Sequence, residues 1–192
     1  AAQYYRFNKP NRWINSGGLG TMGFGLPAAM GVALSFPDAH VACVTGEGSI
    51  QMNIQELATL AGQNLPVKCF VINNQGYASI RTSQNAHFKL LVGADATSGL
   101  ALPQLEQLAA AYGVGYARID DHAGLDSTLL DVLERSGPVI CEVMVQVDEA
   151  RVPRVMTRIN EQGKPVTGAL EDLYPFLPRD EFEQQMLNEE TV

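Results

Sequence analysis

Short apolar runs alternate with helix-like stretches along most of the chain. The runs are nearly continuous in valine, isoleucine, leucine and cysteine, as is typical of strands that are buried on both faces. The strands expected are Trp13–Asn15, Val41–Thr45, Val67–Asn73, Val114–Ile119 and Val139–Val145. Because the intervening stretches have helical character, the sequence predicts an α/β fold, a doubly wound parallel sheet with helices on both faces.

The helix-like stretches carry start and stop signals. Asn53 stands three residues before Glu56 in a capping-box-like spacing, Pro103 suits a first helical turn, and Gly113 suits the position after a helix end. The helices expected are Leu26–Phe36, Asn53–Gln63, Pro103–Tyr112 and Leu125–Arg135.

The apolar periodicity fades from Asp148 onward, where proline and glycine recur. We therefore expect residues 1–147 to form one α/β domain and residues 148–192 to form an extended C-terminal tail that packs over the domain or a partner. A short helix is expected over Arg179–Leu187. The chain begins at Ala1 rather than Met, and we expect it to be a piece of a longer protein.

Composition and charge exclude several classes of protein. A net charge of −8 and a pI near 4.8 argue against a protein that neutralises nucleic acid or an anionic membrane. No apolar stretch approaches the roughly 20 residues of a membrane span, so we expect a soluble, cytoplasmic protein with no membrane or nucleic-acid partner. Cys43, Cys69 and Cys141 lie in separate apolar runs, which favours buried reduced thiols over disulfides or a zinc site.

Two glycine-rich turns stand where a strand is expected to lead into a helix, the edge at which open parallel sheets bind ligands. The first, Gly18–Gly23, satisfies G-x-G-x-x-G, a weak indication of a dinucleotide site. Asp38 has the separation of that motif's acidic residue but precedes the next strand instead of ending it. The second turn, Gly46–Ser49, joins backbone amides that attract phosphate to a carboxylate, Glu47. A divalent cation between the carboxylate and the phosphate would reconcile the two.

A third polar segment, Asn73-Asn74-Gln75-Gly76, ends the apolar strand Val67–Asn73. With a right-handed crossover, the carboxyl ends of adjacent parallel strands point the same way. Glu47 and Asn74 are therefore expected to face one metal ion.

Together these segments resemble the G-D-G…N-N diphosphate motif of thiamine-diphosphate (ThDP) enzymes. The resemblance is carried by Gly46–Ser49, the stretch Asn53–Gln63 and the pair Asn73-Asn74, and the run from Ser16 to Ala29 looks like the acetolactate synthase branch. It implies the C-terminal ThDP-binding domain and fold, with ThDP and Mg²⁺ as cofactors. It also implies a carboligase or decarboxylase of 2-keto acids with pyruvate as donor, and leaves open whether the complete enzyme binds FAD elsewhere.

The resemblance also implies site roles, position by position. Glu47, the Asn74 side chain and the Gly76 carbonyl would hold Mg²⁺, the Gly20 carbonyl would accept from the cofactor's 4′-amino group, and Met22 would lie under the bend between its rings. The cofactor-binding residues implied are Gly18, Gly20, Thr21, Met22, Gly46, Gly48, Ser49, Asn74, Gly76 and Tyr77.

This chain departs from the family pattern at three places. Glu47 replaces the usual aspartate, and the sequence after Gly76 lacks the Trp-Gln pair that acetolactate synthases carry there, which leaves the acceptor open between a keto acid and a keto-sugar. Arg81, in that stretch, is expected to be solvated rather than to meet an anionic substrate. The catalytic glutamate is expected from a pyrimidine-binding domain of a partner subunit, which favours a homo-oligomer.

Three alternatives stay open from the sequence. They are a carboligase of deoxysugar synthesis, a nicotinamide- or flavin-binding oxidoreductase that uses the Gly18–Gly23 turn, and a degenerate regulatory copy of the domain.

Overall fold

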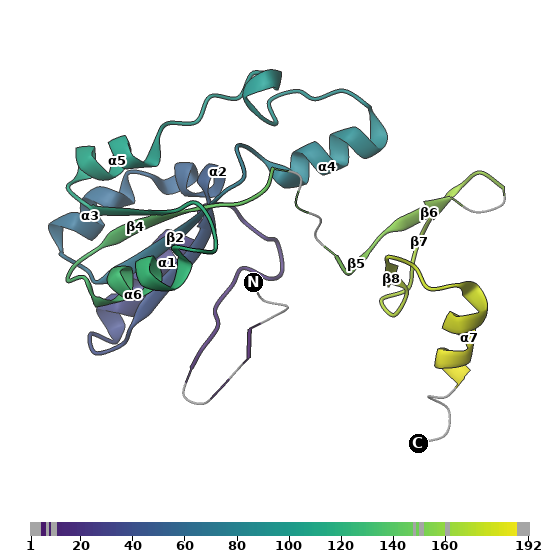
Figure 1. Ribbon diagram of the computed structural model, residues 1–192, viewed down its shortest axis with the longest axis horizontal. Helices are drawn as coiled ribbons and strands as arrows, with labels where there is room; N and C mark the ends of the chain where they lie inside the picture. The colour runs from purple at the N-terminus through teal and green to yellow at the C-terminus, as the bar shows by residue number, and fades with distance from the viewer. Residues whose placement is uncertain are drawn as a thin grey trace. The chain divides into compact units, whose positions relative to one another are not determined.

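The chain divides into two compact units, Ala1–Asp148 and Glu149–Val192. The computed structural model describes residues 5, 6, 8, 11–147, 149, 152–159 and 162–187. The first unit contains a four-stranded sheet in the order β1-β2-β4-β3, with every pair parallel (Figure 1). Its strands are β1 (Val41–Gly46), β2 (Val67–Asn73), β3 (Gly115–Ile119) and β4 (Val139–Met144). The predicted α/β class and four of the five predicted strands are confirmed.

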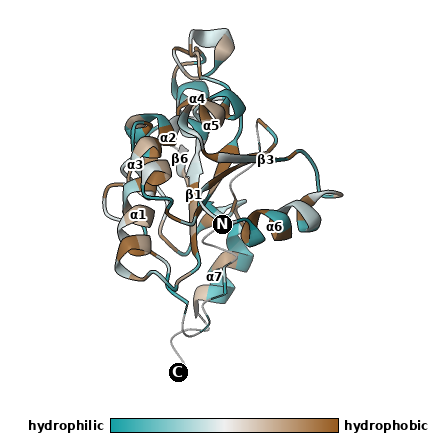
Figure 2. Ribbon diagram, turned by 90° about the vertical axis from the view of Figure 1, so that its left-hand side faces the viewer, coloured by the Kyte–Doolittle hydropathy of each residue, from teal (hydrophilic) through white to brown (hydrophobic). Residues whose placement is uncertain are grey.

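Helices cover both faces of this sheet. Helices α1 (Gly25–Ser35), α3 (Glu56–Gly62) and α5 (Leu105–Tyr112) share one hydrophobic core with β1 and β2, whereas α6 (Leu125–Glu134) packs through Val132 against β3 and β4. Figure 2 shows α1 and α3 on one side of the sheet and α6 on the other. The chain steps outward from β1 to β2 to β3 and then returns to β4, so right-handed crossovers place α6 opposite α3 and α5. The doubly wound arrangement is confirmed.

The three cysteines lie inside this sheet. Cys43 and Cys69 are register partners on β1 and β2, Cys141 is on β4, and all three are buried and free. Burial raises the pKa of the Cys141 thiol to about 11, which keeps it protonated. The prediction of buried thiols without disulfides is confirmed.

The expected strand at Trp13–Asn15 does not form. These residues have no regular structure, Ile14 is exposed, and the Trp13 ring packs at a tilt against the Tyr5 ring, with ring centroids 5.2 Å apart. A run of three residues that contacts no sheet edge has no backbone partner to hold it extended.

Two helix starts differ from the sequence prediction, and one helix was not predicted. The helical region expected from Asn53 already begins at Glu47 with α2 (Glu47–Ile50) and continues through the 3₁₀ turn η1 (Gln51–Asn53) into α3. Pro103 lies before α5, because Gln104 at the helix start is extended, while Gly113 ends α5 with a left-handed backbone as expected. A polar helix, α4 (Ala78–His87), was not predicted, and a short turn, η2 (Ala96–Ser98), follows it.

The second unit is less extended than its sequence suggests. Strands β5 (Arg154–Val155) and β8 (Leu173–Tyr174) pair antiparallel, as do β6 (Thr157–Ile159) and β7 (Pro165–Thr167). The predicted helix forms as α7 (Arg179–Leu187). Arg179 at its start makes two 2.9 Å bonds to the buried carboxylate of Asp172, which fixes the helix to β8 within this unit. Across the described residues of both units, no helix is long and apolar enough to cross a membrane.

Candidate functional site

The two glycine turns meet at the start of the helical region that follows β1. The Gly23 amide donates to the Ser49 hydroxyl at 3.0 Å, and the Asn53 side-chain amide donates to the Gly23 carbonyl at 2.8 Å. Gly23 has a φ of +86°, and a Cβ there would lie 2.7 Å from the Cβ of Met52. Only glycine therefore fits, and Asn53, expected to cap a helix, instead ties the first turn to the second.

Glu47 reaches from the first residue of α2 into the loop that follows β2. Its side chain is buried, with 4% of its surface exposed, and Oε1 accepts from the Gly76 amide at 2.7 Å and the Asn74 amide at 3.2 Å. Burial raises the pKa of the Glu47 carboxyl, against the opposing effects of the Gly76 and Asn74 hydrogen bonds and the positive charge of Arg81. The Glu47 carboxylate and the backbone of Asn74 thus lie side by side at the carboxyl ends of β1 and β2.

Arg81 holds the same loop from the other side. It is buried in α4, and its guanidinium donates to the carbonyls of Asn74 at 2.9 Å, Gln75 at 3.2 Å and Val147 at 2.7 Å. The expectation of a solvated arginine is wrong, because this loop offers backbone acceptors that only a buried, multidentate donor satisfies together. Arg81 is therefore part of the frame of the 74–76 loop.

Gly76 and Gly48 make the close contacts of this loop. Gly76 has a φ of +142°, and a Cβ there would come within 2.3 Å of the Ala94 carbonyl oxygen. A Cβ on Gly48 would lie 2.0 Å from the Tyr77 ring. The Tyr77 ring therefore packs directly on the Gly48 backbone, which brings the residues expected to bind cofactor in the second turn and after β2 into contact.

The outer part of the first turn lies at the surface. Gly18, Gly20 and Thr21 are exposed, and Met22 is 44% exposed. On this part of the chain Leu19 is 92% exposed and Phe24 is 38% exposed, and Met52, which lies against Gly23, is 47% exposed. Gly23 is thus bonded to the second turn, whereas residues 18–22 are exposed at the surface.

Where Glu47 meets the 74–76 loop, the groups that could bind a metal are the Glu47 carboxylate and oxygens of the loop. Within the described ranges of the chain, no three His, Cys, Asp or Glu side chains cluster to hold a metal ion. A cation bound here would therefore depend on Glu47 together with oxygens of the 74–76 loop.

Comparison with known proteins identifies the family of this chain. Residues 1–143 match a model of the family described as "Thiamine pyrophosphate enzyme, C-terminal TPP binding domain". The chain belongs to this family. Thiamine pyrophosphate is ThDP, so the resemblance drawn from the glycine turns and the Asn pair is confirmed at the level of the family.

The relatives of this ThDP domain include acetolactate synthases. The chain is 48% identical to acetolactate synthase isozyme 3 large subunit of Escherichia coli over 136 residues, which cover 70% of this chain and 23% of that protein. It is 43% identical to the acetolactate synthase large subunit of Buchnera aphidicola over 80% of this chain and 27% of that protein. It is also 38% identical to the chloroplastic acetolactate synthase of Arabidopsis thaliana over 81% of this chain and 24% of that protein. The chain thus spans about a quarter of the length of these relatives.

The ThDP domain also contains a polar cluster that sequence reasoning missed. Asn73, Tyr116, Arg118 and Glu142 line a cavity of about 440 Å³ that Glu47 lines as well. The signal was present in the sequence, because Glu142 is a charged residue in a strand predicted to be buried on both faces, and such a residue requires partners.

Proposed function

We propose that this domain binds ThDP together with Mg²⁺ and serves a carboligase or decarboxylase of 2-keto acids, with pyruvate as donor. One observation carries the proposal: the buried Glu47 carboxylate lies in the 74–76 loop, bonded to the amides of Asn74 and Gly76. A buried carboxylate at the carboxyl edge of a parallel sheet is costly unless it is compensated, and a hard cation compensates it well.

The donor set fits Mg²⁺. Both hydrogen bonds to Glu47 are accepted by Oε1, which leaves Oε2 to meet a cation. The side-chain oxygen of Asn74 and the backbone carbonyl of Gly76 belong to the same loop and would supply the other protein ligands. Carboxylate, amide and carbonyl oxygens with added water and phosphate oxygens are the ligands that Mg²⁺ takes.

The second turn fits the diphosphate. A hydroxyl has one donor and two acceptor positions, so Ser49 can accept from the Gly23 amide and still donate to a phosphate oxygen. The amides of Gly48 and Ser49 lie in the first turn of the helical region, where backbone donors point outward. When bound, ThDP would supply the carbon centre that attacks the keto acid. Ser49 and the amides of Gly48 and Ser49 would hold its diphosphate, and Glu47 with the 74–76 loop would hold the Mg²⁺ that neutralises it.

Catalysis in this proposal needs a second domain. The exposed apolar side chains of Leu19, Met22, Phe24 and Met52 beside the glycine turns suit a surface that a pyrimidine-binding domain of a partner subunit covers. That domain would contribute the activating glutamate, and the active enzyme would be a homo-oligomer with the cofactor at the interface.

Two alternatives differ in their support. The nicotinamide or flavin interpretation of residues 18–23 loses its basis, because no strand precedes this turn among the described residues and Asp38 precedes β1. A carboligase of deoxysugar synthesis remains the second candidate, since Tyr77 and α4 occupy the stretch that carries a Trp-Gln pair in acetolactate synthases.

Calorimetric titration of the chain tests the proposal. We expect saturable binding of ThDP that requires Mg²⁺, and no binding of NADH. Binding of NADH, or ThDP binding that is equal with and without Mg²⁺, would contradict it.

A further inference from the structure

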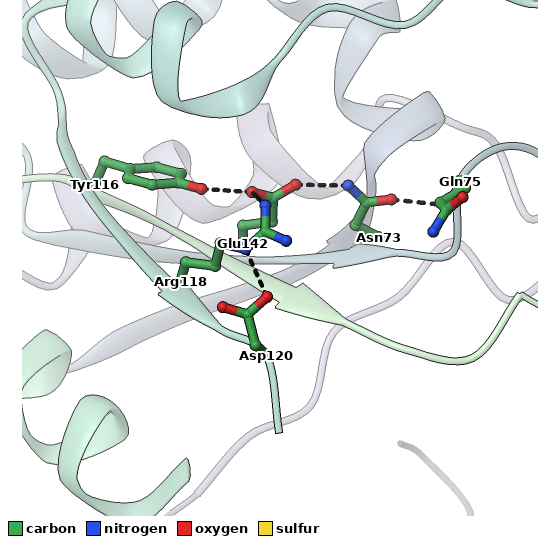
Figure 3. Close-up of polar contacts among 6 residues, drawn as sticks. All are labelled: Asn73, Gln75, Tyr116, Arg118, Asp120 and Glu142. Carbon is green, nitrogen blue, oxygen red and sulfur yellow. Dashed lines mark hydrogen bonds and ion pairs between the residues drawn. The ribbon is translucent and has the colours of Figure 1, made fainter. Parts of the chain in front are cut away.

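A chain of hydrogen bonds runs across three strands to the 74–76 loop (Figure 3). The Tyr116 hydroxyl on β3 donates to Glu142 Oε2 on β4 at 2.5 Å, and the Asn73 side chain on β2 donates to Glu142 Oε1 at 2.5 Å. The Gln75 amide then donates to Asn73 Oδ1 at 2.9 Å. This series of hydrogen bonds therefore ends at the Gln75 backbone amide, in the middle of the loop that Glu47 contacts.

The charge of Glu142 determines which groups donate and which accept in this series of hydrogen bonds. The carboxylate is 5% exposed, and Arg118, itself bonded to Asp120 at 2.7 Å, supplies a third donor to it at 3.3 Å. An ionised carboxylate only accepts, so Asn73 must turn its NH₂ group toward Glu142. Its carbonyl oxygen then faces the loop, where Gln75 needs an acceptor.

The tyrosine at the other end keeps the same polarity. Burial, and to a smaller extent the hydrogen bond to Glu142, raises the pKa of Tyr116 to about 12. The phenol therefore stays protonated and donates. All donors around Glu142 therefore point inward, and the orientation of Asn73 follows from the strands behind it.

We propose that Glu142 is a positioning residue for the cofactor site: by orienting Asn73 it fixes the Gln75 backbone and with it the 74–76 loop that holds Mg²⁺·ThDP. The inference rests on the proposed function. Glu142, Asn73, Gln75 and Glu47 line one cavity, which places the positioning group and the expected metal ligand on the same side of the sheet. Partners that orient metal ligands in this way typically change metal affinity about 10–100-fold when removed.

An exchange of donor and acceptor tests the inference. Asn73→Asp places two carboxylates next to each other. Glu142→Gln leaves a single acceptor oxygen, although Asn73 donates from one side and Tyr116 and Arg118 donate from the other. The double variant restores the pattern. Its introduced glutamine donates to the introduced aspartate and accepts from Tyr116, while the aspartate still accepts from the Gln75 amide. Net charge is the same as in the parent chain.

The readout is the dissociation constant of Mg²⁺·ThDP by calorimetry on the full chain, with the folded fraction measured by circular dichroism. Each single variant is expected to bind about 10-fold or more weakly, and the double variant to return within about threefold of the parent. Lys68→Met is the control, since it removes a buried donor at the far end of β2, away from Asn73, and should leave the constant within about threefold.

The outcomes separate the two proposals. If the parent chain does not bind Mg²⁺·ThDP, the proposed function fails and this inference with it. If the parent binds but the single variants bind equally well, or Lys68→Met weakens binding as much as Glu142→Gln, the positioning inference alone fails. Where a single variant does not fold, the double variant decides: recovered binding supports the inference, and a folded double variant that binds weakly overturns it.

Discussion

Replacement of Glu47 by glutamine separates the charge of this side chain from its hydrogen bonds. Glutamine keeps an oxygen that accepts from the Gly76 and Asn74 amides but loses the negative charge. Glu47→Ala removes both, and Glu47→Asp keeps the charge on a side chain one methylene shorter. We expect glutamine and alanine to abolish Mg²⁺-dependent ThDP binding and aspartate to preserve it.

The expected size follows from ligand linkage. At a ligand concentration 100 times the dissociation constant, binding stabilises the folded state by about 2.7 kcal/mol. For a chain of 150–250 residues each kcal/mol raises Tm by about 2–4 °C, so the parent should gain roughly 5–11 °C. A variant with a 100-fold weaker constant keeps only about 0.4 kcal/mol, which is roughly 1 °C.

Without ligand the order of stabilities differs. Alanine leaves the buried Gly76 amide without its acceptor, at a cost of about 1–3 kcal/mol, whereas glutamine keeps that bond. Because burial raises the pKa of Glu47, its ionised form is disfavoured in the fold. The parent should therefore lose stability as pH rises from the ordinary glutamate pKa through the raised one, and Glu47→Gln should lack this loss.

Thermal denaturation with and without Mg²⁺·ThDP measures all of these quantities, and calorimetry gives the constants directly. Undiminished Mg²⁺-dependent ThDP binding by Glu47→Gln would refute the role of the charge. A metal-free Glu47→Gln protein whose stability falls with pH as steeply as the parent's would refute the assignment of the pH effect to this residue.

Three further substitutions test the frame of the site. Arg81→Ala should cost about 3 kcal/mol in urea unfolding and weaken Mg²⁺·ThDP binding at least 10-fold, because the backbone carbonyls of the loop lose their buried donor. Gly48→Ala should lower the free energy of unfolding by about 1–3 kcal/mol and weaken ThDP binding, and Tyr77→Ala in the same chain should recover the stability, since the ring is what the new Cβ meets. Lys68→Met should cost about 1–3 kcal/mol in urea unfolding, because the bonds to the Arg135 and Gly137 carbonyls are lost. Its Mg²⁺·ThDP affinity, measured by calorimetry, should stay unchanged, because these bonds lie at the far end of β2.

The core strands were predictable because burial on both faces leaves a continuous apolar run. The short run at Trp13 carries the same local signal, but a strand exists only where a neighbour supplies backbone partners, which three residues do not reveal. Helix α4 failed in the opposite way. Its residues are mostly polar, and it is anchored by the contacts of Arg81 with the 74–76 loop, which no periodicity within the helix encodes.

The position of the site was predictable from topology, and its internal contacts were not. Two polar turns that follow adjacent parallel strands must share one edge of the sheet, so the sequence alone predicts that Glu47 and Asn74 lie close together. Which atoms meet depends on side-chain reach. The Glu47 carboxylate contacts the amides of the loop, whereas the Asn74 side-chain oxygen lies 3.4 Å from Arg81.

These contacts explain how a glutamate can stand where the family carries aspartate. Glu47 reaches the Gly76 amide, and Arg81 and Asn73 bond to Asn74 and Gln75 of the same loop. Every one of these bonds is made within the chain, so the shape of the loop is set by the fold, and a cation bound there, as proposed, would meet ligands that are already placed. Glu47 bonds to a loop that other residues already hold, so ordering its longer side chain costs little conformational entropy. The geometry therefore tolerates glutamate. The binding of Mg²⁺·ThDP should depend on Arg81 and Asn73 as well as on Glu47.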